Sequence, residues 1–289
     1  MVDRLHRVVI ARLPGLAQER VRRLGEGQDN VAYEVDGWLI VRFTNNADRS
    51  VVEREASLLT AIGKVSPLPV PVPMFVDEVE GCLAYRRLPG VPLLELAPSP
   101  QQRFAGDIAS RLGEFLSAIH AVPIRELAGL VELDAQPPRG WLAGARDEYV
   151  AVVDHVPAEY RPTVEAFLTA PPPAPSGHNV FSHNDLGIEH VLVDPENGEI
   201  GGVIDWSDAA ITDPAYDLGL VLRDLGPVAL DAALASYTRV EVGLPERAAF
   251  YARCSVLEDL RYGVEEGRQT YAEKSLRSLA WLFPPDSPR

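Results

Sequence analysis

The feature that most constrains this chain is a pair of short apolar runs separated by a turn signal. The runs are Val191–Val193 and residues 202–204, and residues 194–198 between them read Asp-Pro-Glu-Asn-Gly. This pattern is typical of a tight β-hairpin. Because a hairpin brings its two ends together, Asp185, just before the first run, and Asp205, just after the second, are expected to lie side by side.

A pair of carboxylates at this place has a definite chemical use. One carboxylate can act as the base for a hydroxyl proton while the other holds a divalent cation. The alternative is an ordinary loop and hairpin, because His-x-Asp triplets such as residues 183–185 are common on solvated turns. A further run, Asp-Pro-Ala-Tyr-Asp-Leu at residues 213–218, favours the catalytic interpretation, and its Asp213 and Asp217 are expected to cap helices and hold the loop.

The spacing of these residues resembles the phosphoryl-transfer motifs of protein-kinase-like enzymes, and among them the aminoglycoside phosphotransferase family. That family reads roughly His-x-Asp-Leu-x-x-x-Asn and then Ile-Asp-(Phe/Trp), and His183, Asp185 and Asp205 match it residue by residue. The Asn position holds His190, a substitution that resembles the aminoglycoside 2''-phosphotransferase type. The resemblance implies that Asp185, with His183, is catalytic, and that Asp205 and His190 hold Mg²⁺.

The same resemblance implies an α+β, two-lobed protein-kinase-like fold. A small antiparallel β-sheet would form an N-terminal nucleotide-binding lobe over residues 1–88. A larger, mainly helical catalytic and substrate-binding lobe would occupy residues 91–289, with the hinge at about residues 85–90. The length agrees with this division, because 289 residues exceed the usual size of a single core. The resemblance covers about residues 20–265 and is weak in the acceptor region.

The first 45 residues carry the signals of a helix and a hairpin sheet. Residues 4–13 have a helical pattern, and Asp36-Gly37 is a strong two-residue turn signal between runs at 31–35 and 38–43. The loop before the first of these runs contains glycines, whose backbone N–H groups can cover nucleotide phosphates. The alternative is a simple turn. The residues expected to bind the nucleotide there are Gly25, Gly27, Asp29 and Asn30.

Arg42 stands where kinase-like enzymes carry a strand lysine that contacts phosphates and pairs with a helix glutamate. Arginine keeps the charge but presents it as a planar fork. The predicted helix 48–62 offers Glu53 and Glu55 as partners, and we favour Glu55 because the family's similar segment uses its second Glu. The alternative for Arg42 is a charged residue on the solvent face of a strand. The hinge residues expected to bind the purine through main-chain groups are Tyr85, Arg87 and Leu88.

The acceptor pocket is expected among the C-terminal helices. Residues 251–267 have helical spacing and carry acidic and aromatic side chains. They form either an anionic wall for a cationic ligand, or a solvated face with Arg261 and Arg268 as ion-pair partners. The substrate residues named on this basis are Asp208, Glu258, Asp259 and Tyr262.

Charge and cysteine content limit the partners. The chain carries 27 Lys and Arg against 42 Asp and Glu, and its net charge of −15 repels nucleic acid and anionic membranes and favours cationic small molecules. General solubility is the competing explanation of this charge. The sequence has no apolar run of ~18 residues, as a spanning helix requires, and no signal-peptide pattern. The two cysteines, Cys82 and Cys254, form no disulfide framework. We expect a cytoplasmic protein, monomeric or a weak dimer.

These observations predict a small-molecule kinase with ATP or GTP and Mg²⁺ as cofactors. By resemblance it would transfer the γ-phosphate to a hydroxyl of an aminoglycoside-type antibiotic, giving resistance by inactivation. A kinase of a macrolide or other antibiotic, or of a metabolic amino alcohol or sugar, is the alternative on the same fold. A catalytically silent nucleotide-binding protein is a further one, because Arg42 and His190 depart from the family motif. The acceptor hydroxyl and the purine preference stay open at this point.

Overall fold

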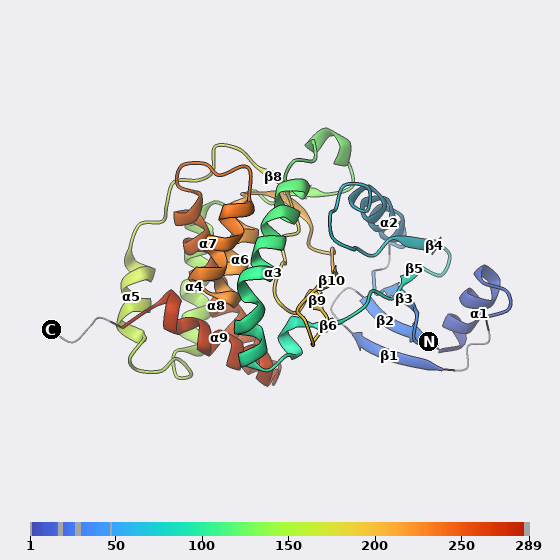
Figure 1. Cartoon of the computed structure of the whole chain (residues 1–289), viewed down its shortest axis with the longest axis horizontal. Helices are drawn as coiled ribbons and strands as arrows, with labels where there is room; N and C mark the ends of the chain where they lie inside the picture. The colour runs from blue at the N-terminus through green and yellow to red at the C-terminus, as the bar shows by residue number, and fades with distance from the viewer. Residues whose placement is uncertain (1, 17–19, 27–29, 47, 286–289) are drawn as a thin grey trace.

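Five antiparallel strands form the sheet of the first lobe, at one end of the molecule (Figure 1). The computed structural model describes residues 2–16, 20–26, 30–46 and 48–285. The strands are β1 (Val21–Glu26), β2 (Asn30–Val35), β3 (Leu39–Thr44), β4 (Pro73–Asp77) and β5 (Cys82–Arg86). They lie in the order β1-β2-β3-β5-β4. The β2–β3 turn requires positive φ at Asp36 (50°) and Gly37 (79°), and these residue types adopt it with little strain.

Alternation along β3 sends its side chains into two different cores. Val41 belongs to a small core that is closed by helix α1 (Val2–Arg12). Ile40, on the opposite face, belongs to the large core that includes helix α2 (Val51–Ile62). Arg42 shares the face of Ile40, so the period of the strand directs its guanidinium toward α2.

A second, three-stranded sheet joins the two lobes. It has the order β10-β9-β6, with β6 (Val91–Pro92), β9 (Val191–Val193) and β10 (Ile200–Val203). The predicted hairpin is β9–β10. Gly201 lets the chain after β5 pack directly on this hairpin, because a Cβ at Gly201 would overlap the carbonyl oxygen of Pro89. The hairpin therefore sits against the segment that connects the lobes (Figure 1).

Helices form most of the rest of the chain. Helix α6 is buried on nearly all sides and packs against α8 and α9, while α3 packs against α7. A third sheet, β7-β11-β8, places the end of β8 directly before His183. These elements are η1 (Leu93–Glu95), α3 (Pro98–Ile119), η2 (Ile124–Leu127), β7 (Glu132–Leu133), α4 (Pro138–Val152), α5 (Arg161–Thr169), β8 (Val180–Ser182), β11 (Ala210–Thr212), α6 (Ala215–Leu225), α7 (Pro227–Ser236), α8 (Leu244–Glu265) and α9 (Gln269–Leu282).

The predicted α+β, kinase-like fold is confirmed by this arrangement of an antiparallel sheet followed by a helical lobe. The division at residues 88 and 91 stays a prediction. Among the helices that the structure describes, none is both long enough and apolar enough to cross a membrane.

Candidate active site

A buried carboxylate of α6 holds the loop between β8 and β9, residues 183–190, which we name the catalytic loop. Asp217 accepts hydrogen bonds from the backbone N–H groups of His183 (3.0 Å) and Asn184 (2.9 Å), and it contacts Nε2 of His120 (3.1 Å). Burial would raise the pKa of Asp217, but these hydrogen bonds and the neighbouring imidazoles hold it below its usual range. Asn184 needs such support, because its φ of 64° is left-handed. Asp217 therefore holds the loop, as expected.

His183 joins the two ends of the hairpin. Its buried ring packs on Trp206, with centroids 4.5 Å apart. Nδ1 accepts a hydrogen bond from the backbone N–H of Asp185 (3.3 Å), and Nε2 bonds to the carbonyl oxygen of Ile204 (3.0 Å), the residue before Asp205. Burial lowers the pKa of His183 to about 4, so the ring is neutral and Nε2 carries the proton. The buried ring holds the backbone on both sides of the hairpin, which fits a positioning role, and a direct catalytic role for His183 stays a prediction.

Asp185 and Asp205 lie on either side of one imidazole. Nδ1 of His190 donates to the backbone carbonyl of Asp185 (2.8 Å) and lies 3.3 Å from its Oδ2, while Nε2 lies 3.8 Å from Oδ2 of Asp205. Burial raises the pKa of Asp185 to about 6. Burial also acts on Asp205, but Arg42 and His190 outweigh it and lower the pKa of that carboxyl. Asp185 is therefore the more basic carboxylate, suited to accept a proton, and Asp205 stays ionised, as a cation ligand must.

Arg42 ties the first sheet to α2 and to the segment after β10. Its Nη1 donates to Oε1 of Glu55 (2.8 Å). Its Nη2 donates to Oγ of Ser207 (2.9 Å) and lies 3.5 Å from Oδ1 of Asp205. The predicted Arg42–Glu55 pair is confirmed, and the planar fork reaches the Asp205 segment at the same time. Ser207 was missed, because the sequence marks it only by its place two residues after Asp205.

The predicted hinge residues differ in whether their polar groups are already hydrogen-bonded within the protein. Tyr85 is buried, its hydroxyl shares a hydrogen bond with Arg42, and burial raises the pKa of this phenol to about 12. The backbone N–H of Arg87 already donates to the carbonyl oxygen of Trp38 (2.6 Å). This donor is therefore not free for a base. The side chain of the next residue, Leu88, packs against Gly202 of the hairpin.

The predicted phosphate loop is described only at its two ends. Gly25 lies where the pairing of β1 and β2 shifts register, and Asn30 begins β2 opposite Thr44. Gly27 and Asp29 lie outside the described residues.

An acidic pocket of about 200 Å³ lies between α4 and α8. Trp141 and Glu148 of α4 and Glu258 of α8 line it. Burial raises the pKa of Glu258, and the nearby charge of Glu148 adds to the shift. Trp141 packs on Tyr216 (centroids 4.9 Å apart), whose pKa is raised by burial and by the charges of Glu258 and Asp185. The phenol of Tyr216 is thus acted on by the pocket residue Glu258 and by Asp185 of the catalytic loop.

The outward face of α8 combines a pocket wall with ion pairs. Tyr262, one turn after the pocket residue Glu258, is 44% exposed. Arg261 pairs with Glu148 (3.3 Å) and with Glu265 (2.9 Å). The ion-pair interpretation therefore holds for Arg261, and the wall for a cationic ligand stays a prediction. The contribution of α4 was missed, because no sequence signal tells which helix packs against α8.

The two remaining predicted substrate residues have different surroundings. The backbone carbonyl of Asp208 accepts a hydrogen bond from Nδ2 of Asn184 (3.0 Å), which places Asp208 beside the catalytic loop. Asp259 is buried and is bonded to Oγ of Ser275 (2.6 Å) and Nζ of Lys274 (3.2 Å). These contacts give Asp259 a role inside the fold, and its predicted contact with a substrate stays a prediction.

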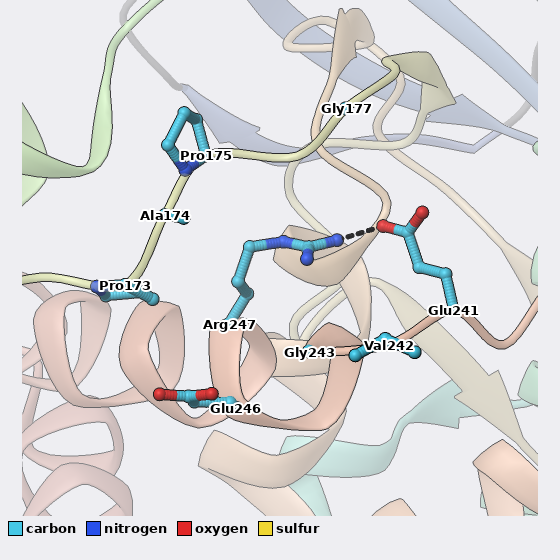
Figure 2. A pocket seen from close by; sticks show the side chains of 9 residues that line it. All are labelled: Pro173, Ala174, Pro175, Gly177, Glu241, Val242, Gly243, Glu246 and Arg247. Atoms are coloured by element: carbon cyan, nitrogen blue, oxygen red, sulfur yellow. Dashed lines mark hydrogen bonds and ion pairs between the residues drawn. The ribbon is translucent and has the colours of Figure 1, made fainter.

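A larger pocket, of about 240 Å³, lies away from these residues, between the proline-rich segment 173–177 and the start of α8 (Figure 2). Arg247 points into it and bonds to Glu241, as Figure 2 shows, and also to Asp213 (2.8 Å). The cation is thus neutralised within the fold. None of the predicted site residues lines this pocket.

The donor atoms of the site limit which metal it can hold. The described residues contain no group of three or more His, Cys, Asp or Glu side chains arranged to hold a metal. Asp205 offers an ionised carboxylate, and Nε2 of His190 lies 3.8 Å from it. Burial opposes a charge on His190, but the carboxylates of Asp185, Glu189 and Asp205 raise its pKa, and the ring would have to be neutral to bind a metal. Such a sparse set suits Mg²⁺, which takes one or two protein carboxylates together with substrate phosphates and water. The carboxylate of Asp205 therefore fits a magnesium ion that the phosphates of a nucleotide help to hold.

Comparisons with known proteins agree with this geometry. The viomycin phosphotransferase of Streptomyces vinaceus is 29% identical over 190 residues, which is 64% of this chain and 64% of that protein, so the match spans less than two thirds of its length. The GDP and kanamycin complex of APH(2'')-IIia has a TM-score of 0.70 and 21% identity, and covers 95% of this chain and 97% of that chain.

The apoenzyme of macrolide 2'-phosphotransferase MphH from Brachybacterium faecium has a TM-score of 0.63 and 24% identity, and covers 99% of this chain and all of that chain. At these identities the solved structures are alike in fold. The profile of the phosphotransferase enzyme family matches residues 20–251, most of the chain. This chain therefore belongs to the phosphotransferase enzyme family.

Proposed function

We propose that this protein transfers the γ-phosphate of ATP or GTP to a hydroxyl of an aminoglycoside-type antibiotic and thereby inactivates it. The observation that carries the proposal is the joining of Asp185, His190 and Asp205 at the open end of the hairpin, with Arg42 and Glu55 beside them. This arrangement supplies the groups that phosphoryl transfer requires, a base, an ionised cation ligand and a cation for phosphate.

Asp185 is assigned the central chemical role. Its carboxylate orients the acceptor hydroxyl and accepts its proton late in the transfer. The pKa of about 6 leaves Asp185 mostly ionised at neutral pH, yet basic enough to take a proton. His183 and Asp217 hold the loop backbone on both sides of Asn184, so the carboxylate is oriented before the acceptor arrives.

The nucleotide would lie between the first sheet and the hairpin. Arg42, paired with Glu55, would steady the phosphates, Gly25 and Asn30 border the loop that covers them, and the residues around Tyr85 would hold the purine. Asp205 and His190 would hold Mg²⁺, which supplies charge neutralisation at the phosphates when bound. A cytoplasmic location, where nucleoside triphosphates are available, and a monomer or weak dimer belong to this proposal.

The acidic pocket supports a cationic acceptor. Trp141 offers an aromatic face and Glu258 a negative charge, and Glu148, which also pairs with Arg261 (3.3 Å), completes the acidic wall. Kanamycin, bound by a structural relative, is an aminoglycoside. The macrolide phosphotransferase has the same fold, so a macrolide is the second candidate. We favour the cationic acceptor, because two carboxylates in the pocket wall disfavour an apolar ligand.

The test is a transfer assay with purified protein, Mg²⁺ and either ATP or GTP, against aminoglycosides, macrolides and small amino alcohols or sugars. We expect phosphorylation of an aminoglycoside, and its loss by a large factor in Asp185→Asn with the fold and nucleotide binding retained. Transfer only to a macrolide or a metabolite would replace the acceptor class. No transfer to any acceptor would remove the enzymatic assignment and leave a nucleotide-binding protein.

A further inference from the structure

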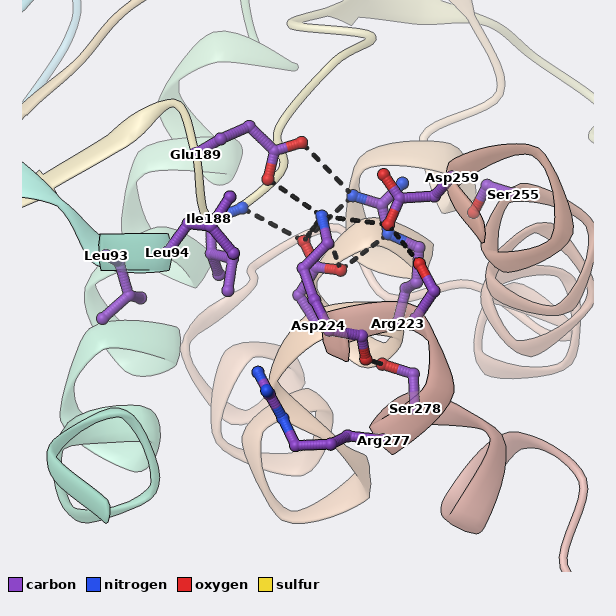
Figure 3. A network of polar contacts seen from close by, with 12 residues as sticks. Leu93, Leu94, Ile188, Glu189, Arg223, Asp224, Ser255, Asp259, Arg277 and Ser278 are labelled. Atoms are coloured by element: carbon purple, nitrogen blue, oxygen red, sulfur yellow. Dashed lines mark hydrogen bonds and ion pairs between the residues drawn. The ribbon is translucent and has the colours of Figure 1, made fainter. Parts of the chain in front are cut away.

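A buried cluster of charges lies beneath the catalytic loop and joins it to three helices. Lys274 of α9 is only 1% exposed, and its ammonium lies 2.9 Å from Oε2 of Glu189, 3.2 Å from Oδ2 of Asp259 and 3.5 Å from Oδ1 of Asp224. Arg223 donates to Asp224 at 2.7 and 2.9 Å. Figure 3 shows Glu189 pointing from the loop toward Arg223 and Asp224.

This cluster holds the loop at two successive residues. The backbone N–H of Ile188 donates to Oδ2 of Asp224 (3.0 Å), and the next residue, Glu189, supplies the carboxylate that Lys274 binds. Gly187 lets that carboxylate fold back over the loop, because a Cβ at Gly187 would overlap it. The second half of the loop is therefore held through side-chain charges, as the first half is held by Asp217.

Residue 274 is a lysine in a chain whose other cations are almost all arginines, and the shape of its ammonium group suits this buried cluster. The chain has two lysines, Lys64 and Lys274, among its 27 Lys and Arg residues. A compact ammonium donates in three directions, whereas a guanidinium presents a planar fork. Burial and Arg223 oppose the charge on Lys274, but the carboxylates of Asp224, Glu189 and Asp259 outweigh them and raise its pKa. The cation therefore persists and crosslinks the loop, α6 and α8.

We propose that Lys274 is a positioning residue for phosphoryl transfer, and that it acts through Glu189 to set the places of Asp185 and His190. Glu189 directly precedes His190 and lies four residues after Asp185, so a displacement of its carboxylate is transmitted to both. Lys274 lies beyond residues 20–251, the segment that matches the family profile. The inference rests on the proposed function, since positioning has a kinetic meaning only where transfer occurs.

The first test compares two variants of α9. Lys274→Met removes the charge and keeps most of the side-chain length, whereas Arg277→Met removes a cation that contacts Gln101 (3.4 Å) and not the loop. We expect Lys274→Met to lower kcat on the order of 10- to 100-fold, with the nucleotide KM changed less than about threefold. Arg277→Met should leave both unchanged. A folded Lys274→Met protein with kcat within about twofold of the parent overturns the proposal.

A second variant decides the matter if Lys274→Met does not fold. Gly187→Ala displaces the Glu189 carboxylate while Lys274 keeps its partners on α6 and α8. A loss of kcat similar to that expected for Lys274→Met supports the proposal. Unchanged kcat in a folded Gly187→Ala protein overturns it, because the Lys274–Glu189 contact would then be without effect on transfer.

Amide hydrogen exchange tests this inference separately from the proposed function, because it measures the protection of the loop amides without any substrate. The amides of Ile188 and His190 donate to Asp224 (3.0 Å) and to the carbonyl oxygen of Gly187 (3.0 Å). We expect both to exchange on the order of tenfold faster in Lys274→Met, or in Gly187→Ala, than in Arg277→Met. Equal protection overturns the inference whether or not transfer is found. If the parent protein transfers no phosphate, the proposed function is refuted. Faster amide exchange in Lys274→Met would then still show that the Lys274–Glu189 contact holds the loop.

Discussion

Replacing Asp217 by asparagine tests the view that one buried carboxylate holds the catalytic loop. Its Oδ1 accepts from the N–H of Asn184, and its Oδ2 accepts from the N–H of His183 and contacts His120. Asparagine keeps one acceptor oxygen, so its best orientation points the amide NH₂ at the N–H of Asn184. A hydrogen bond to a charged group contributes ~1.5–3 kcal/mol, and a stranded buried donor costs ~1–3 kcal/mol. We expect Asp217→Asn to lower the free energy of unfolding by about 2.5–6 kcal/mol.

The same variant should lose turnover, because the disturbed Asn184 directly precedes Asp185. Urea unfolding followed by circular dichroism measures the stability, and steady-state kinetics with the acceptor found in the transfer assay measures kcat. Asp231→Asn, on the exposed face of α7, is the matched control and should stay within ~0.5 kcal/mol of the parent. An Asp217→Asn protein with the stability and kcat of the parent would refute the reasoning that this carboxylate orders the loop.

Three further outcomes follow from the structure. Gly201→Ala should destabilise the protein by about 1–3 kcal/mol, because the new Cβ overlaps a carbonyl oxygen. The control Gly106→Ala, in open space on α3, should be neutral or should stabilise the protein by up to ~1 kcal/mol. Equal urea midpoints for the two variants would contradict this prediction. Glu258→Gln should raise KM for a cationic acceptor on the order of tenfold, and a parallel rise in the nucleotide KM would speak against a pocket for the acceptor alone. Despite burial, Arg223 and Lys274 lower the pKa of Asp224 to about 2, below the 3.8 of an unperturbed carboxyl, so its stabilising contribution is complete above about pH 4 and is lost as the pH falls toward 2. Asp224→Asn should therefore make stability less dependent on pH in that range, and an unchanged acid unfolding curve would disprove it.

The parts of the site that lie close together along the chain were predictable from its sequence. Asp185 precedes the first strand of a short hairpin and Asp205 follows the second, so the turn at residues 194–198 made their proximity predictable. The contacts of Asp217 and Lys274 that hold the loop were not predictable in this way. The pairing of Arg42 with Glu55 is also local, because a strand and the helix after it carry the two charges. In each case backbone periodicity decides the direction of the side chain.

The residues of α8 show that the sequence could not predict which acidic side chains face the pocket and which are buried. Glu258 and Asp259 are neighbours of similar chemistry, yet a rotation of ~100° per residue sends one into the acidic pocket and the other into the core. Charged residues lie on both of these faces, so the helical pattern did not distinguish them. The packing of α9 distinguishes the two residues, because Lys274 and Ser275 provide the partners that make burial of Asp259 possible.

The sequence pattern alone therefore predicted the paired carboxylates at the hairpin, the antiparallel sheet before it and the family to which the fold belongs. The acceptor pocket between α4 and α8, and the contact of Lys274 with Glu189 across 85 positions, were decided by the folded structure alone. The physical reason is that turns and alternating strands are encoded by neighbours in sequence. Which helices meet, and which of their charges become buried partners, depends on the packing of the whole core.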